Sequence, residues 1–169
     1  MSDIVVGREG ETFIADWGAG ARRCAVGRGG IAEKQREGDG ITPVGVWPLR
    51  NVLYRPDRLS PPDTTLAVSP LAPSDGWCEA PDDPDYNRMI ALPHPAASDS
   101  LWRQDALYDL VLVVGYNDAP VVPGRGSAIF IHVARENYGP TAGCVALTRG
   151  DLLDALAQLQ PGDRLVVKS

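Results

Sequence analysis

Clusters of basic residues are missing from this 169-residue sequence. Its 16 Lys and Arg are outnumbered by 22 Asp and Glu, which gives a net charge of −6. Proteins that bind nucleic acid neutralise phosphates with grouped cations, so nucleic acid is not an expected partner. A small basic groove for an acidic substrate remains compatible with this charge.

Long apolar runs are also missing. No stretch approaches the roughly 20 residues that a membrane span needs, so no transmembrane segment is predicted. The first residues, MSDIVVGREG, have neither a basic start nor a long apolar stretch, and they are therefore not interpreted as a secretory signal. Two alternatives stay open: a cytoplasmic protein, or one whose export signal has been removed.

The three cysteines form no metal-binding pattern. The sequence has no CxxC pair and no His/Cys ligand spacing, so no metal or cofactor is expected. Cys24 and Cys78 are best explained as small packed residues, with a disulfide between them as the lesser alternative. Cys144 is considered separately below.

What the sequence does contain is turn residues: 18 glycines and 15 prolines, with 44% apolar residues. This composition predicts one domain over residues 1–169, mainly β, with long loops. Short strands are expected over 4–16 and 21–27, and strands buried on both faces over 110–116 and 127–133. Pro43 and Pro48 favour an edge strand. A long connection is expected over 56–95, and a helical turn over 101–108.

One helix is predicted near the C-terminus. Thr148 and Asp151 resemble a capping pair, and an apolar stripe at helical spacing follows at Leu152, Leu153, Leu156 and Leu159. Pro161 and Gly162 end the helix, and RLVVKS forms a final strand. The expected fold is thus a β-sheet structure with one amphipathic helix packed on it.

The segment GPTAGCVAL contains Cys144, the main candidate for a catalytic residue. Cys144 follows Gly143, and His132 lies twelve positions upstream near the end of a buried strand. A histidine can activate a thiol as a nucleophile, Gly143 permits unusual backbone angles, and nearby backbone amides can stabilise an oxyanion. Thr141 can orient a partner through its hydroxyl. From these residues alone, a buried structural Cys and a core His remain an alternative.

Several separated motifs resemble the L,D-transpeptidase (YkuD-type) catalytic domain, in the branch with a [ST]-x-G-C-[VI]-A-L cysteine motif. They are RCAVGRGGI, DGITPVGVWPLR, GWCEAPDDPDYNR, LYDLVLVVGYN, PGRGSAIFIHV and PTAGCVAL. The resemblance implies a β-sandwich and a cysteine nucleophile that needs no cofactor. It implies that Cys144 attacks peptidoglycan stem peptides, forming a thioester that a second stem peptide resolves into a 3→3 cross-link. His132 would be the general base, Gly143 the turn and a backbone donor, and Thr141 the family's Ser or Thr.

Three departures from the commoner motif S-H-G-C-I-R stand out. Ala142 and Ala146 replace its His and its Arg or Asn, Val133 follows the catalytic His, and the His-to-Cys loop is short. Polar groups that orient the imidazole or hold a substrate carboxylate are therefore missing. Two alternatives follow: an L,D-carboxypeptidase or other muropeptide hydrolase, and a non-catalytic wall-binding module. The resemblance implies a location in the cell envelope or periplasm, while the missing signal peptide keeps a cytoplasmic location open, and the protein is expected to be a monomer.

Five further residues are predicted to bind substrate. Arg88 can bind a carboxylate, and it shares the long connection with Trp77 and Asn87; Tyr116 and Asn117 end a strand beside that of His132. The alternative is that the aromatics only pin the loop. His94, between two prolines, is expected to be an exposed loop residue with no partner visible in the sequence, and a site role is its lesser alternative. Asp39–Gly40 is expected to form a turn.

Overall fold

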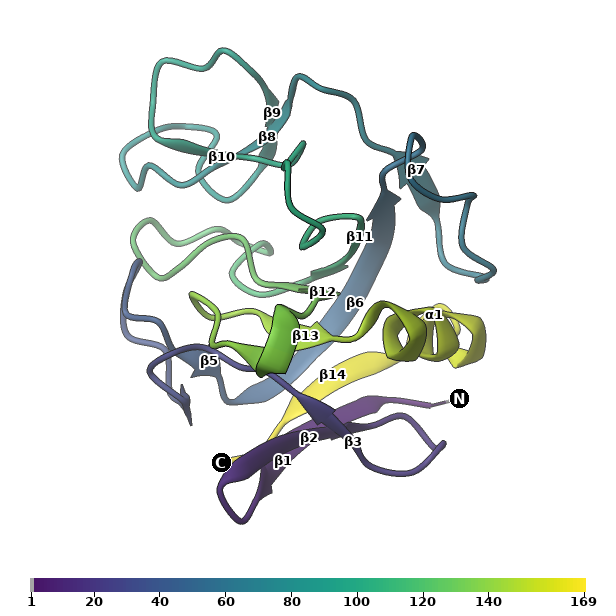
Figure 1. Cartoon of the computed structure of the whole chain (residues 1–169). Coiled ribbons are helices and arrows are strands. Elements are labelled where there is room, and N and C mark those ends of the chain that lie inside the picture. The colour runs from purple at the N-terminus through teal and green to yellow at the C-terminus, as the bar shows by residue number, and fades with distance from the viewer. Residues whose placement is uncertain (1) are drawn as a thin grey trace.

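The computed structural model describes residues 2–169. It is mainly β, with a single α-helix near the C-terminus, as the sequence predicts (Figure 1). The elements, in chain order, are β1 (Ile4–Glu9), β2 (Thr12–Asp16), β3 (Arg22–Cys24), β4 (Ile31–Ala32), β5 (Thr42–Pro43), β6 (Gly45–Tyr54), β7 (Val68–Pro70), β8 (Asp75–Cys78), β9 (Met89–Ala91), β10 (Ser98–Ser100), β11 (Leu110–Val114), β12 (Phe130–Val133), the 3₁₀ turn η1 (Glu136–Tyr138), β13 (Val145–Leu147), α1 (Arg149–Gln158) and β14 (Arg164–Val167).

A large curved sheet forms the scaffold. Its strand order is β13-β12-β11-β6-β14-β1-β2-β3, and β7 pairs with β6 outside this path. The two ends of the sheet meet, because Ala25, just after β3, exchanges two 2.9 Å backbone hydrogen bonds with Ala146 of β13. The sheet therefore wraps around an interior, which is the sandwich-like arrangement expected from the sequence.

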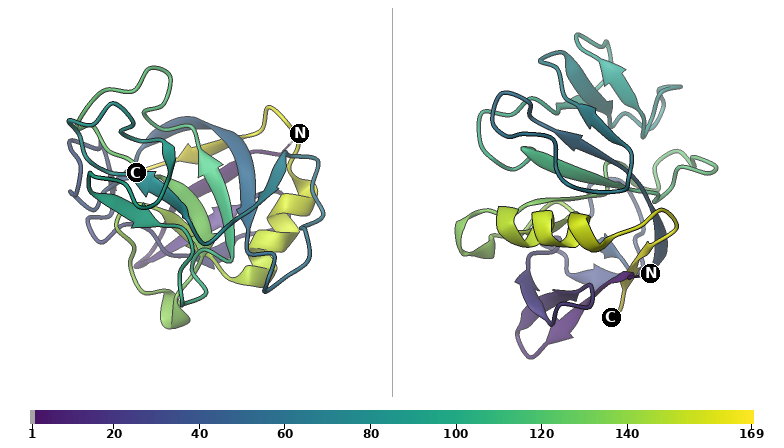
Figure 2. Two further views of the ribbon diagram at one scale, coloured as in Figure 1. Left: turned by 90° about the horizontal axis from the view of Figure 1, so that it is seen from above. Right: turned by 90° about the vertical axis from the view of Figure 1, so that its right-hand side faces the viewer.

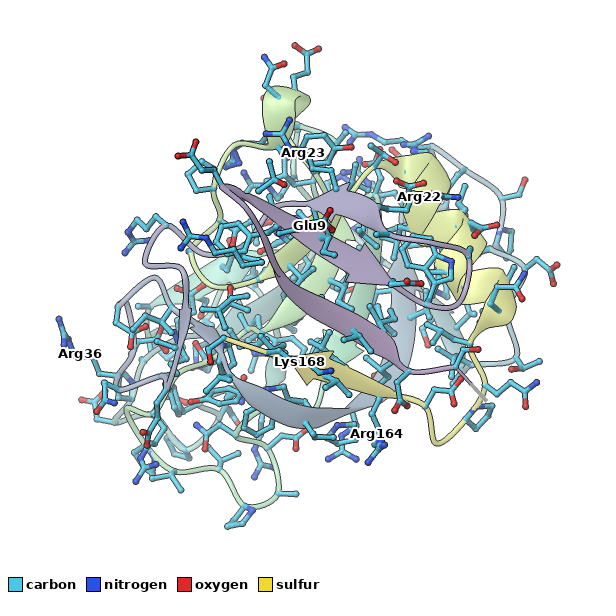
Figure 3. All side chains as sticks on the ribbon, turned by 90° about the horizontal axis from the view of Figure 1, so that it is seen from below. Glu9, Arg22, Arg23, Arg36, Arg164 and Lys168 are labelled. Atoms are coloured by element: carbon cyan, nitrogen blue, oxygen red, sulfur yellow. The ribbon has the colours of Figure 1, made fainter. Side chains whose placement is uncertain are left out.

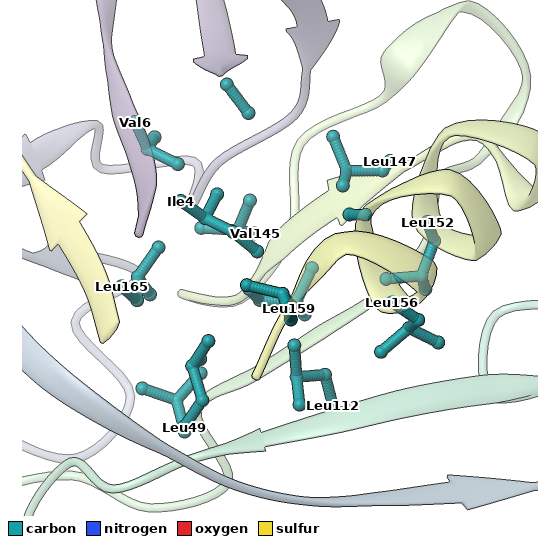
Figure 4. Packing of buried hydrophobic residues seen from close by; sticks show 14 of the residues in the cluster. Ile4, Val6, Leu49, Leu112, Val145, Leu147, Leu152, Leu156, Leu159 and Leu165 are labelled. Atoms are coloured by element: carbon teal, nitrogen blue, oxygen red, sulfur yellow. The ribbon is translucent and has the colours of Figure 1, made fainter. Parts of the chain in front are cut away.

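The main apolar core fills this interior, and α1 packs against it. Leu152, Ala155 and Leu156 of the helix are buried, as is Leu159 just beyond it, whereas Leu153 is only partly buried. Figure 4 shows Leu152, Leu156 and Leu159 together with Ile4, Leu112 and Leu165 of the surrounding strands. The Thr148 hydroxyl accepts a hydrogen bond from the Asp151 amide at 3.2 Å, which confirms the predicted helix cap.

Strands β11 and β12 are buried on both faces, as predicted. Ile131 and Val133 of β12 face the main core, while Phe130 belongs to a second apolar cluster on the opposite face. That second cluster also contains Tyr108, Val111 and Cys144. The candidate nucleophile thus lies on the outer side of the sheet, under the long connection.

The long connection is more regular than the sequence indicates. It contributes β7 to the large sheet, and it folds a separate three-stranded sheet in the order β10-β8-β9. Figures 1 and 2 show this small sheet on the side of β11 and β12 that faces away from β1–β3. The helix α1 lies between the small sheet and strands β1–β3. The segments are too short and polar to show strand periodicity in the sequence.

Two local predictions are wrong. Residues 101–108 form bends and turns, not a helical turn. β6 is not an edge strand, because β14 and β11 pair with it on its two sides. Pro48 is accommodated since pairing with β14 ends there, pairing with β11 begins at Leu49, and the Pro48 carbonyl accepts a hydrogen bond from the Gly115 amide at 2.7 Å.

All three cysteines of the described chain are free thiols, so Cys24 and Cys78 form no disulfide. The cations on the face formed by β1, β2, β3 and β14 are spread apart (Figure 3). Two of them pair with acids: Arg164 with Asp3 at 2.9 Å, and Arg22 with Asp151 at 3.5 Å. No helix within residues 2–169 is long and apolar enough to cross a membrane.

Candidate active site

Strand pairing brings Cys144 and His132 to one face of the sheet. β12 and β13 are parallel, with Ile131 beside Val145 and His132 beside Ala146. Continuing this register places Cys144 beside Phe130, two residues before His132 on the same face. Such diagonal neighbours lie roughly 7 Å apart. The pair that the sequence predicts therefore lies on one face of the sheet, with His132 in the middle pair of the ladder and Cys144 just before its first pair.

The resting thiol of Cys144 is held by the backbone of its neighbours. Its Sγ accepts a hydrogen bond from the Phe130 amide at 3.3 Å and donates one to the Ala128 carbonyl at 3.1 Å. Within residues 2–169, no hydrogen bond joins this thiol to His132. Burial raises the pKa of Cys144 to about 12, so its resting form is the neutral thiol.

The imidazole of His132 is oriented by the backbone. Its Nδ1 lies 2.9 Å from the Val133 carbonyl oxygen. Because a carbonyl oxygen can only accept, Nδ1 carries the proton and Nε2 is left as the basic nitrogen. The Tyr108 ring packs edge-on against the imidazole with 5.4 Å between centroids. Burial lowers the pKa of His132 to about 4, so a neutral imidazole faces a neutral thiol.

This arrangement compensates for the missing polar side chains of the motif. The Val133 carbonyl orients His132, although the Val133 side chain lies in the main core. Ala146 is 1% exposed, and its backbone pairs with that of Ala25 where the two ends of the sheet meet. Ala142 is exposed at the mouth of the site.

Gly143 and Thr141 shape the turn before the cysteine. Gly143 has φ +141°, and a Cβ at this position would lie 3.0 Å from the Ile41 carbonyl oxygen, so glycine is needed on both counts. The Thr141 hydroxyl donates to the Cys144 carbonyl at 2.6 Å and accepts from the Gly143 amide at 3.1 Å. Thr141 therefore orients the turn, and the Gly143 amide is occupied in the resting site.

Cys144 and His132 line a cleft of about 310 Å³, whose other lining residues include both cations and acids. Its cations are Arg28, Lys34, Arg103 and Arg135, and its acids are Glu37, Glu79 and Asp99. Burial, with repulsion from Asp99 and Glu37, raises the pKa of Glu79 to about 7. Burial also raises the pKa of Asp99, whose Oδ2 accepts a 2.9 Å hydrogen bond from the Tyr108 hydroxyl. The cleft suits a ligand that carries both an amine and a carboxylate.

Lys34 is a site residue that the sequence did not indicate. Its side chain is buried, and Nζ donates to Asp39 Oδ1 at 2.7 Å and to the Ile41 carbonyl at 3.1 Å. Nζ lies 3.6 Å from where a Gly143 Cβ would be, so the ammonium group sits next to the cysteine turn. Asp39 also accepts from the amides of Gln35, Arg36 and Ile41, which confirms the predicted turn. Only the fold brings Lys34 to Cys144, over a hundred residues away.

The five predicted substrate-binding residues lie outside the lining of this cleft. Arg88 is exposed. Asn87 is buried: its Oδ1 accepts from Trp77 Nε1 at 2.9 Å and from the Ala128 amide at 3.0 Å. Its Nδ2 donates to the carbonyls of Tyr116 and Asn117.

Asn87 thus fixes Ala128, whose carbonyl binds the Cys144 thiol. Tyr116 and Asn117 are also engaged internally, with Tyr116 Oη donating to the Arg125 carbonyl and Asn117 Nδ2 to those of Val122 and Gly126. In this structure these residues brace the site from behind and do not face the cleft.

The site defines a class of protein: a β-sheet scaffold that presents a cysteine and a histidine in a charged cleft, suited to acyl transfer through sulfur. The chain belongs to the YkuD family of L,D-transpeptidase catalytic domains, whose model matches residues 4–167. Neither the curated proteins nor the solved structures contain a significant match.

Proposed function

We propose that this protein is a cysteine acyltransferase that acts on peptidoglycan stem peptides and forms 3→3 cross-links. The observation that carries the proposal is the position of Cys144: next to His132, at the floor of a cleft with cationic and acidic groups, in a chain of the YkuD family. Stem peptides carry both carboxylates and free amines, which these groups can bind.

The first step forms a thioester. Cys144 Sγ attacks the carbonyl between the L-centre of diaminopimelate and the terminal D-alanine, and Nε2 of His132 takes the thiol proton. The S–C bond forms, the C–N bond breaks, and the proton passes to the D-alanine amine as it leaves. Because the resting thiol donates to Ala128, Sγ must first turn from that carbonyl toward the imidazole.

The second step resolves the thioester. The amine of a second stem peptide attacks the thioester carbonyl, a new C–N bond forms, and the S–C bond breaks. His132 accepts the amine proton and returns a proton to the sulfur. The basic residues of the cleft can hold the carboxylates of the two peptides, and Glu79 and Asp99 can hold the approaching ammonium group before it loses its proton.

Covalent labelling tests the nucleophile. Intact-mass spectrometry after incubation with a carbapenem should show one adduct on the wild type and on Cys24→Ser, which replaces another buried thiol, and none on Cys144→Ala. His132→Ala should slow labelling by about a hundred- to ten-thousandfold. An unlabelled wild type would count against the thioester.

Products on purified muropeptides then test the transfer. Dimers joined 3→3 are expected from the wild type and not from Cys144→Ala. Shortened monomers without dimers would mean that water resolves the thioester, and the protein would be an L,D-carboxypeptidase. Binding of muropeptides without any turnover would instead support a wall-binding module.

A further inference from the structure

Three metal-binding side chains converge in the small sheet, away from the cleft. Cys78 ends β8, Asp83 lies in the turn that follows, and His94 lies between β9 and β10. The Sγ atom of Cys78, a carboxylate oxygen of Asp83 and a ring nitrogen of His94 all lie within 4.8 Å of one another. The sequence spacing did not indicate a metal site because these residues meet only through the fold of the long connection.

The distance between two of the donors suits zinc. His94 Nε2 and Asp83 Oδ2 are 3.2 Å apart. In a tetrahedral zinc site with Zn–N and Zn–O bonds of about 2.0 to 2.2 Å, neighbouring ligand atoms are roughly 3.3 to 3.5 Å apart. A small approach of Cys78 Sγ would complete three of the four ligands.

The surroundings of the cluster hold the ligands in place. Asp83 Oδ1 accepts the Asp85 amide at 2.8 Å, so the carboxylate is fixed through its other oxygen. The backbone of Cys78 is paired through both its groups, with the Arg88 carbonyl at 2.9 Å and the Asn87 amide at 3.0 Å. The side chains of Asp83 and His94 are each 14% exposed, which leaves a path from solvent for an ion and a fourth, water ligand.

A histidine–aspartate ion pair with a packed thiol beside it is the simpler explanation. The Cys78 thiol is, however, buried against the carboxylate of Asp83 and near the ring of His94, where a metal-binding sulfur would lie. His94 is also not the exposed, unpartnered loop residue expected from the sequence. A thiolate, an imidazole and a carboxylate together are a donor set that suits zinc better than magnesium or calcium.

We propose that Cys78, Asp83 and His94 bind a zinc ion. Binding releases the thiol proton of Cys78 to solvent, and the fourth position is taken by water. None of the three residues lines the cleft, so the site is structural. It fastens the Asp83 turn and the His94 loop to β8, and Glu79, the residue after Cys78, lines the cleft.

The proposed zinc site is also connected to the nucleophile through packing. Trp77 of β8 packs edge-on against Phe130 with 5.0 Å between centroids, and the Phe130 amide binds the Cys144 thiol. Zinc would therefore make one wall of the cleft more rigid. The inference does not depend on the proposed acyl transfer, since metal binding can be measured without any substrate.

Cobalt(II), which substitutes for zinc and absorbs light, tests the site. The full chain carrying Cys144→Ala, which removes the catalytic thiol as a competing ligand, should bind one Co²⁺ with a thiolate charge-transfer band, and one equivalent of Zn²⁺ should remove the band. Adding Cys78→Ser should abolish the band. Adding His94→Ala should weaken binding by about a hundredfold or more, beyond the loss typical of a group that only orients a ligand. Adding Cys24→Ser, the matched thiol control, should change nothing.

Thermal unfolding gives a second measurement. Zinc at about a hundred times its dissociation constant should raise the Tm of the wild type by about 5 °C or more, and should not raise that of His94→Ala. His94 lies in a surface loop, so this variant remains informative if Cys78→Ser does not fold. Absence of the band, or a band that persists in His94→Ala at the same Co²⁺ concentration, would overturn the proposal.

Discussion

The buried imidazole of His132 makes the stability of the protein depend on pH in a predictable way. Its pKa is lowered from 6.5 to about 4 in the folded chain, mainly by burial. Between these pH values the unfolded chain binds a proton that the folded chain does not. The contribution of His132 to the free energy of unfolding is therefore complete above about pH 6.5 and is lost as the pH falls to about 4.

The magnitude follows from the same two values. The difference between 6.5 and about 4, at about 1.4 kcal/mol for each pKa unit, gives about 3.5 kcal/mol in total, of which about 3 kcal/mol is lost by pH 4. Carboxylates also titrate in this range, so the wild type must be compared with His132→Gln, which has no imidazole. The free energy of unfolding of the wild type should fall between pH 7 and pH 4 by about 3 kcal/mol more than that of the variant.

Urea unfolding at several pH values measures this difference, and proton NMR measures the titration directly. The chain has only two histidines, so His94→Ala assigns the imidazole signals. A chelator in the buffer keeps His94 free of metal. We expect the His132 signals to stay unchanged from pH 8 to about pH 5. In labelling experiments, the rate at which a carbapenem acylates the protein should fall on acidification with a midpoint near pH 4.

Two results would refute this reasoning. His132 could titrate near pH 6.5, which would mean that the imidazole is hydrated in solution. Alternatively, the wild type and His132→Gln could lose equal stability on acidification. Either result would reopen a thiolate–imidazolium pair as the resting state, in place of the neutral pair described above.

The remaining predictions concern the groups around the nucleophile. Asn87→Ala removes the four hydrogen bonds of a buried side chain and should lower the free energy of unfolding by about 3 kcal/mol, measured in urea. A loss no larger than that of Asn137→Ala, an exposed residue with the same positive φ, would contradict the bracing role. Gly143→Ala should cost about 1 to 3 kcal/mol and abolish carbapenem labelling, whereas Gly150→Ala, in α1 with open space around it, should label normally. Glu79→Gln should stabilise the protein by about 1 to 3 kcal/mol at pH 8 and much less at pH 5. With a pKa raised from 4.5 to about 7, the wild type loses stability as the pH rises through this range, because the unfolded chain ionises Glu79 first. Equal effects at both pH values would show that Glu79 is solvated.

Much of the scaffold could be predicted because it depends on local patterns. Strands β11 and β12 are buried along their whole length, which the sequence shows as apolar runs. The helix is marked by its Thr148 cap and by the spacing of Leu152, Leu156 and Leu159. The prediction of an edge strand failed at Pro48 because a proline can lie within a sheet where the strand changes partners, and only the register reveals such a place.

The candidate site, like the scaffold, could be predicted only in part. Cys144, His132, Gly143 and Thr141 are all visible in the sequence, and the parallel pairing of β12 with β13 brings His132 to the same face as Cys144, at the end of the turn that Thr141 and Gly143 form. The role of Asn87 could not be predicted, since a buried asparagine that braces a loop and an asparagine that binds substrate look alike in a sequence. Its hydrogen bond to the Ala128 amide decides which one applies here.

The sequence by itself determined a mainly β chain with one C-terminal helix, a cysteine beside a glycine, and the motifs that resemble the YkuD family. These features are carried by residues near one another along the chain. The tertiary structure alone decided that His132 and Cys144 are both neutral, that Lys34 lies beside the cysteine turn, and that Cys78, Asp83 and His94 meet. Burial and ligand geometry depend on what surrounds a group in space, and those surroundings come from segments far apart in the sequence.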